Sequence, residues 1–176
     1  MEFVYEDDRR DGYFFDAGSF RLDLYRLITC FYSSVAFARY GEDIDHDPIR
    51  NLQGEYEGNE IVRLLVNISV QARIMDDRDA LLSSRFLLHC GLLVPNLDNP
   101  QKDIPLTLRE ACNKVIHAKK FNWDVEQLKD EGNLPYPTTQ YLTPRIYLYG
   151  LHGKSKWKAT LDISKFVKYN ASLWSG

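Results

Sequence analysis

The chain begins with long segments in which apolar residues recur every three or four positions. This spacing places the apolar side chains on one face of an α-helix, so each segment is predicted to be a helix packed on a core. Polar or turn-forming residues separate the segments, notably the polar stretch 42–58. The predicted helices are 19–40, with Ser19 as its cap, 60–77, capped by Asn59, 79–90, and 107–120.

The pattern changes after residue 121. Residues 121–144 contain three prolines in their second half and are predicted to be a loop. Further on, alternate residues are apolar, which predicts a strand, and "HGKS" at 152–155 predicts a hairpin turn. One face of this strand carries Trp157, Ala159, Leu161 and Ile163, and the other carries Lys156, Lys158, Thr160 and Asp162.

These patterns together predict a mainly α protein, a bundle of four to five helices with a C-terminal β-hairpin. We expect a single domain over 1–176, with the helical bundle at 18–120, the loop at 121–144, and the hairpin and a final short helix, capped by Ser164, at 145–174.

Composition and motifs limit the cellular location and the kinds of site that we expect. No apolar run approaches the ~18 residues that span a bilayer, and the acidic start "MEFVYEDDRR" does not resemble a signal peptide, so no membrane association is expected. Three cysteines without CxxC spacing indicate reduced thiols of a cytoplasmic protein. We find no nucleotide-binding, dinucleotide-binding or zinc-protease motif, and we expect neither a cofactor nor a metal. The acidic stretch 43–47 is interpreted as a solvated loop, since it lacks the glycine and glutamate of a calcium loop.

Charge is distributed unevenly. The formal net charge of −3 argues against nonspecific coating of nucleic acid, which needs a strongly basic surface. Residues 101–120 nevertheless carry five cationic and two acidic residues, a net of +3, and residues 152–158 add three lysines. Two basic patches on an acidic protein favour directed contact with an anion, although lysines that only keep the surface soluble are an equal alternative for the second patch.

The segment "TLREACNKVIHAKK", residues 107–120, carries the strongest candidate chemistry. Thr107 and Glu110 have the spacing of a capping box. Arg109, Asn113 and His117 follow one another at intervals of four, within about 80° on a helix. Histidine can transfer a proton near neutral pH, arginine can hold phosphate oxygens, and asparagine can orient either group. Further positive charge for RNA or phosphate comes from Lys114 and Lys120.

A structural role is an equally concrete interpretation of this stripe. Arg109 can pair with an acid of a neighbouring helix, and His117 can donate to a backbone carbonyl. In that case both side chains stabilise the fold and neither is catalytic.

The segment "ACNKVIHA", residues 111–118, resembles the signature of HEPN-domain proteins, in which an Arg, often followed by Asn, precedes a His by four to six residues. Asn113 and His117 match that signature, whereas Cys112 stands at the usual Arg position and Arg109 lies one turn earlier. The resemblance implies a helical bundle, a homodimer with a composite site, metal-independent ribonuclease activity with His117 as general acid/base, and a place in toxin–antitoxin or antiviral defence systems.

Two functions remain open. The first is a HEPN-like ribonuclease that uses His117, Arg109 and Asn113 on an RNA substrate. The second is a non-catalytic helical module that binds a protein partner through the C-terminal hairpin or an aromatic surface. The aromatic residues Tyr147, Tyr149 and Trp157 fit both, because they can stack on bases beside lysines or pack as cross-strand pairs.

Overall fold

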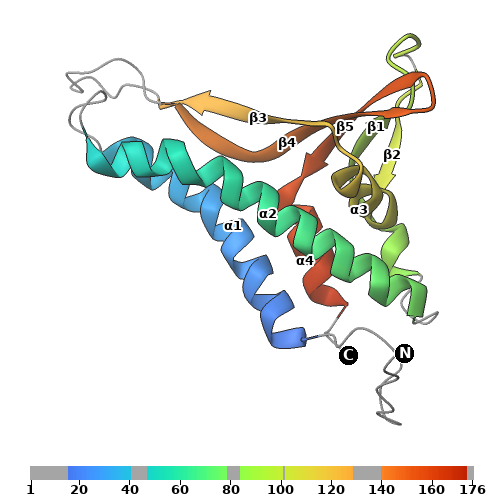
Figure 1. Cartoon of the computed structure of the whole chain (residues 1–176), viewed down its shortest axis with the longest axis horizontal. Helices are drawn as coiled ribbons and strands as arrows, with labels where there is room; N and C mark the ends of the chain where they lie inside the picture. The colour runs from blue at the N-terminus through green and yellow to red at the C-terminus, as the bar shows by residue number, and fades with distance from the viewer. Residues whose placement is uncertain (1–15, 41–46, 79–83, 101, 129–139, 174–176) are drawn as a thin grey trace, which may run out of the picture.

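The computed structural model describes residues 16–40, 47–78, 84–100, 102–128 and 140–173 (Figure 1). Helices and a β-sheet form two layers, with the helices on one side of the sheet. The elements in chain order are α1 Ala17–Tyr40, α2 Pro48–Arg78, the 3-10 turn η2 Arg85–Leu87, β1 His89–Val94, β2 Ile104–Thr107, α3 Leu108–Ile116, β3 Lys120–Gln127, β4 Gln140–His152, β5 Ser155–Asp162 and α4 Ile163–Ser172.

The sheet corrects the predicted fold class. Five strands pair in the order β2-β1-β5-β4-β3, and every pairing is antiparallel. The prediction of a mainly α bundle with only a hairpin is therefore wrong. Strands β1 and β2 lie inside the region 18–120 assigned to the bundle, and β3, apart from its first residue Lys120, lies inside the predicted loop 121–144.

The error at residues 79–90 concerns a short apolar run, and such runs fit a helix and a buried strand equally well. From His89 onward this run is strand β1, and Arg85–Leu87 form only one 3-10 turn. Pairing with distant segments stabilises the strand, because β1 lies between β2 and β5. Gly91 permits the close approach of β5, since a Cβ on Gly91 would lie 2.0 Å from the carbonyl oxygen of Thr160. The preceding residues 79–83 lie outside the described part of the chain.

The core lies between the sheet and the helices. The alternation predicted for the last strand is confirmed, since Trp157, Ala159 and Leu161 are buried on the helix side of β5. The turn at "HGKS" is also confirmed, with His152 paired to Ser155 and Gly153 at a φ of 59°. The alternate residues of β4 and β5 therefore form a second, outward face, on which none of the described helices lies.

Helices α1 and α2 form an antiparallel pair below the sheet (Figure 1). Side-chain hydrogen bonds join them near both ends of α1, from Asn67 to Asp23 and from Arg50 to the carbonyl of Ala38. Helix α2 begins eleven residues before its predicted cap, because Pro48 suits a first helical position and the Asp47 carboxylate accepts from the Ile49 amide at 2.9 Å. Among the described residues, no helix is long and apolar enough to cross a bilayer.

Candidate nucleic-acid interface

Helix α3, which carries the predicted stripe, begins where the sequence indicates. The Thr107 hydroxyl accepts a hydrogen bond from the Glu110 amide at 3.2 Å, so Thr107 is confirmed as the cap. The reciprocal half of the predicted capping box is not formed, since the Glu110 carboxylate binds Asn113 and Lys114. Leu108, Ala111, Cys112 and Val115 are buried, and this apolar face fixes the direction in which the polar residues of α3 point.

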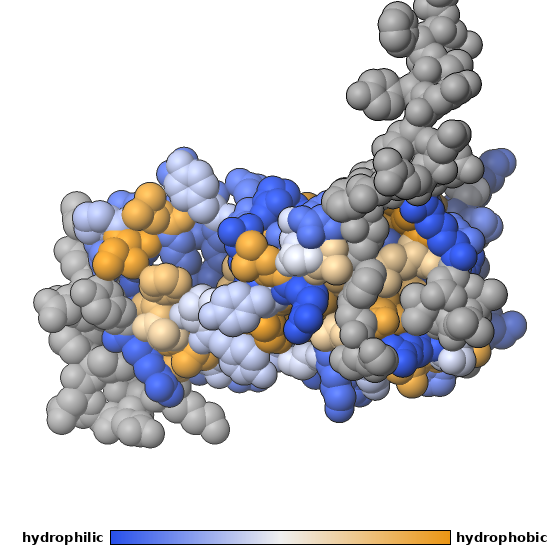
Figure 2. Space-filling view, turned by 90° about the horizontal axis from the view of Figure 1, so that it is seen from below, coloured by the Kyte–Doolittle hydropathy of each residue, from blue (hydrophilic) through white to orange (hydrophobic). Residues whose placement is uncertain are grey.

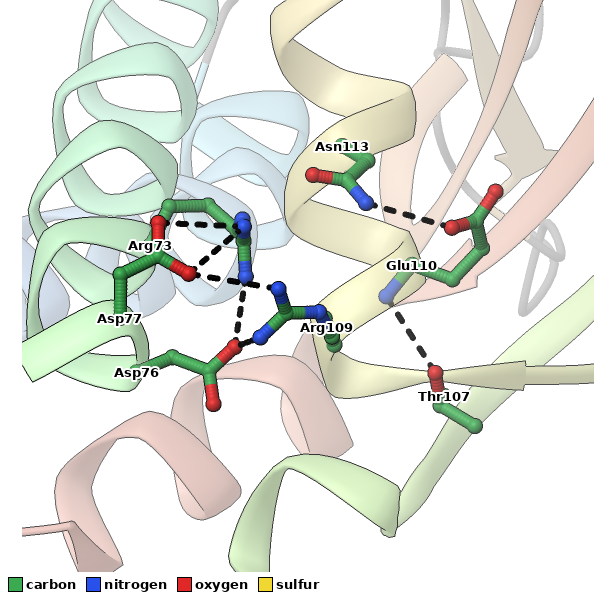
Figure 3. Close-up of polar contacts among 7 residues, drawn as sticks. All are labelled: Arg73, Asp76, Asp77, Thr107, Arg109, Glu110 and Asn113. Carbon is green, nitrogen blue, oxygen red and sulfur yellow. Dashed lines mark hydrogen bonds and ion pairs between the residues drawn. The ribbon is translucent and has the colours of Figure 1, made fainter. Parts of the chain in front are cut away.

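Arg109 at the first turn of α3 points to the end of α2 (Figure 3). Its guanidinium forms ion pairs with Asp76 and with Asp77, the latter at 3.2 Å. Arg73 binds the same two carboxylates, at 2.5 and 3.1 Å. Two arginines thus neutralise two aspartates. This arrangement matches the interpretation in which Arg109 has a structural role and pairs with acids of a neighbouring helix.

Asn113 and Lys114 both turn to Glu110. The Asn113 side-chain amide donates to Glu110 at 3.3 Å (Figure 3), and the Lys114 ammonium pairs with the other carboxylate oxygen at 2.9 Å. Lys114 also lies 4.7 Å from the ring centroid of Trp157, with its side chain only 16% exposed. The Lys114 ammonium is therefore already neutralised by Glu110 within the fold.

His117 follows the last residue of α3 as its C-terminal cap, and its side chain is exposed. Its backbone amide donates to the Asn113 carbonyl at 3.0 Å. His117 lies eight positions after Arg109, which at a rise of about 1.5 Å per residue places their backbones ~12 Å apart along the axis. Because Asp76 and Asp77 of α2 hold the Arg109 guanidinium, Arg109 is not directed to His117 within one protomer, and the composite site of a homodimer remains a prediction.

A different group of residues converges on the outward face of the sheet. Strand pairing places Lys120 opposite Tyr149 and Tyr149 opposite Lys158, so three strands contribute to one cross-strand row. The Lys158 ammonium lies 4.7 Å from the ring centroid of Tyr147 and 5.9 Å from that of Tyr149. We call Lys120, Tyr147, Tyr149, Lys156 and Lys158 the tyrosine–lysine face.

The tyrosine–lysine face has one ring fixed by hydrogen bonding. The Tyr147 hydroxyl donates to Asp124 at 2.7 Å, and Thr143 donates to the same carboxylate at 2.6 Å. The bonds from Thr143 and Tyr147, together with Arg145 at 3.8 Å, lower the pKa of Asp124, and the bond to Asp124 raises the pKa of Tyr147. Tyr147 is therefore held in place as a neutral phenol.

The two ends of the sheet differ in charge, with lysines toward the hairpin and acidic residues at the other end. Lys119 and Lys120 lie just before and at the start of β3, at the end of β3 that is nearer the hairpin turn carrying Lys154 and Lys156. At the far end a small pocket of about 270 Å³ includes three acidic residues, Asp124, Glu126 and Asp162, against one arginine. An anionic ligand is thus favoured only at the hairpin end.

Sequence reasoning found part of this surface. It named Tyr147, Tyr149 and the hairpin lysines together, but it placed Trp157 among them, and Trp157 is buried on the opposite face. It assigned Lys120 to the stripe, whereas strand pairing places it beside Tyr149. Asp76, Asp77 and Asp124 were missed, since long-range pairing leaves no local signal.

Metal binding can be assessed only for the described residues. Within the described ranges, no group of three His, Cys, Asp or Glu side chains is placed to hold a metal ion. Of the acidic stretch 43–47, residues 43–46 lie outside those ranges.

No protein-family model, curated protein or solved structure significantly matches this chain.

Proposed function

We propose that the protein binds single-stranded RNA on the tyrosine–lysine face. The observation that carries the proposal is the row Lys120–Tyr149–Lys158, which puts an aromatic ring between two cations on an outward sheet face. Proteins that bind single strands combine aromatic rings, on which bases stack, with cations that follow the phosphates.

Spacing on the strand supports this role. Tyr147 and Tyr149 are alternate residues of β4, so their side chains leave the same face about 6.6 Å apart. Two neighbouring bases can each stack on one ring. Lys158 lies against both rings in the free protein, and a base that takes its place leaves the ammonium to pair with a phosphate.

The test is fluorescence anisotropy with a labelled twelve-nucleotide RNA and wild type, Tyr149→Ala and Lys158→Gln. Loss of one stacked base is expected to weaken binding about tenfold, since stacking contributes about 1–3 kcal/mol per base. Tyr25→Ala and Lys168→Gln are matched controls, because both side chains are exposed on helices away from the outward face of the sheet. Equal affinity of all five proteins would contradict the proposal.

Salt dependence is a second measurement on the same complex. Three phosphate contacts by Lys120, Lys156 and Lys158 predict a slope of about −2 in a plot of log affinity against log salt. Lys158→Gln should make this slope shallower, whereas Tyr149→Ala should lower affinity without changing the slope.

RNA cleavage is a second candidate function, favoured by the exposure of His117 two residues before Lys119, whose amide donates to the Tyr149 carbonyl at 2.8 Å. In this HEPN-like scheme the ribose 2′-oxygen attacks the adjacent phosphate, and the bond from phosphorus to the 5′-oxygen of the next nucleotide breaks. His117 moves a proton, either from the 2′-OH or to the departing 5′-oxygen. Arg109 is already paired, so among the described residues near His117 in the sequence, Lys119 or Lys120 is proposed as the cation. Cytoplasmic location, a toxin–antitoxin or antiviral role and contact of the hairpin with a protein partner are further predictions.

Cleavage is tested with the same RNA in EDTA. Wild type should leave 2′,3′-cyclic phosphate ends, and His117→Ala should not, while His89→Ala, another exposed histidine, serves as the matched control. Binding without cleavage by wild type would leave the first proposal standing and remove the second.

A further inference from the structure

An apolar groove lies between α1 and α2, away from the tyrosine–lysine face. Its volume is about 480 Å³, and Phe37, Ile49, Leu52 and Tyr56 on its walls are each 37–57% exposed. Figure 2 shows apolar side chains on this helical face, including a group toward the end where α1 leads into α2. Large apolar side chains gathered in one groove mark a binding surface more often than isolated exposed ones do.

The α2 wall has the spacing of a helix-binding groove. Ile49, Leu52, Tyr56 and Glu60 follow one another at three- and four-residue intervals and line one side, opposite Cys30, Ser33 and Phe37 of α1. From Ile49 to Glu60 the wall extends for about 16 Å, the length of three helical turns. A groove between two helices of this length accommodates the apolar face of a third helix.

One carboxylate in the groove has no cationic partner in the part of the chain that the structure describes. Glu57 is half-buried and accepts hydrogen bonds from the Gln53 side-chain amide at 3.2 and 3.3 Å, but no lysine or arginine among the described residues forms an ion pair with it. Burial raises the pKa of Glu57. Glu60, one turn away, is paired with Arg63 at 2.7 Å. A partly desolvated charge without a counter-ion favours a ligand that brings a cation.

We propose that this groove binds an amphipathic helix of a partner protein that places a lysine or arginine on Glu57. Its nine lining residues include two glutamates and no cation, so an acidic helix is disfavoured. A second copy docked by the same face would set one Glu57 near the other, and like charges repel. The proposal does not depend on RNA binding, because the groove and the tyrosine–lysine face belong to different elements.

The test uses a labelled fifteen-residue helical peptide of leucine and lysine, and a matched peptide of leucine and glutamate, with the full chain. The lysine peptide should bind saturably and about tenfold more weakly to Glu57→Gln, the loss of one hydrogen bond to a charged group. Leu52→Ala should also weaken binding. Glu55→Gln, an exposed carboxylate of the same helix, and Leu22→Ala, an exposed leucine of α1, lie outside the groove and should bind as wild type does.

Three results would overturn the proposal. The first is no saturable binding of the lysine peptide. The second is binding that the groove variants and their controls share equally, or that the glutamate peptide matches. The third is a dimer in sedimentation that Leu52→Ala dissociates, which would make a second copy the occupant. Circular dichroism of each variant verifies that a loss of binding is not a loss of fold.

Discussion

The two halves of α2 differ in how their buried or half-buried carboxylates are paired. Near the C-terminal end, the Asp76 side chain is only 2% exposed and is bound by both Arg73 and Arg109. In the N-terminal half, Glu57 is half-buried, and its described hydrogen-bond partners, the Gln53 amide and the Ser34 hydroxyl, are uncharged. The first arrangement is complete within the chain and joins α3 to α2. The second leaves a charge unmatched, which is why we assign binding to the groove and a structural role to the Arg109 network.

Asp76→Asn is expected to produce the largest effect, since it leaves two arginines beside a neutral amide. Breaking a buried pair typically costs about 3–5 kcal/mol, and the partial exposure of Arg109 places the expected loss near the lower value, about 3 kcal/mol. Urea unfolding measures it. Asp77→Asn is the matched control, because that carboxylate is 57% exposed, and it should cost less than about 1 kcal/mol.

Arg109→Gln should have an intermediate effect, a loss of about 1 kcal/mol, because Arg73 still holds Asp76 and Arg109 is 45% exposed. RNA affinity should stay within about twofold of wild type if the network is purely structural. Arg21→Gln, an exposed arginine of α1, is the control. A variant with unchanged stability that loses RNA cleavage would instead make Arg109 catalytic and remove the contrast between the two ends.

Glu57→Gln should have a smaller effect of opposite sign. The amide removes a half-buried charge that nothing in the described chain neutralises, so at pH 7 the variant should be more stable than wild type by less than about 1 kcal/mol. Urea unfolding beside Glu55→Gln decides the sign. A clear destabilisation would show that the chain does use the Glu57 charge.

The smallest effect is the pH dependence of that difference. Burial raises the pKa of Glu57 in the folded state above its unfolded value, so folding takes up a proton as the pH falls through the folded pKa. The folded wild type therefore gains relative stability on acidification, and the advantage of Glu57→Gln should shrink between neutral and mildly acidic pH. Unfolding curves of both proteins at several pH values measure this change, and a constant difference would refute it.

Local signals predicted some elements correctly. The Thr107–Glu110 spacing gave the start of α3, because a cap is satisfied within four residues. The apolar alternation from Trp157 gave β5, because a strand with one buried face records that burial at every second position. The sequence of strand β3 carries no such alternation. Its partly buried and exposed residues show no alternation, and its pairing with β4 stabilises it.

The sequence by itself determined the helical periodicity of α1 and α2, the cap of α3 and the hairpin, since each depends on residues close together in the chain. Only the tertiary structure decided that His89–Val94 is a strand and that Lys120 lies beside Tyr149. It also decided that Arg109 binds Asp76, whereas Glu57 has an amide and no described cation as its partner. Those outcomes depend on contacts between distant segments, and the spacing of residues along the chain does not encode which segments meet.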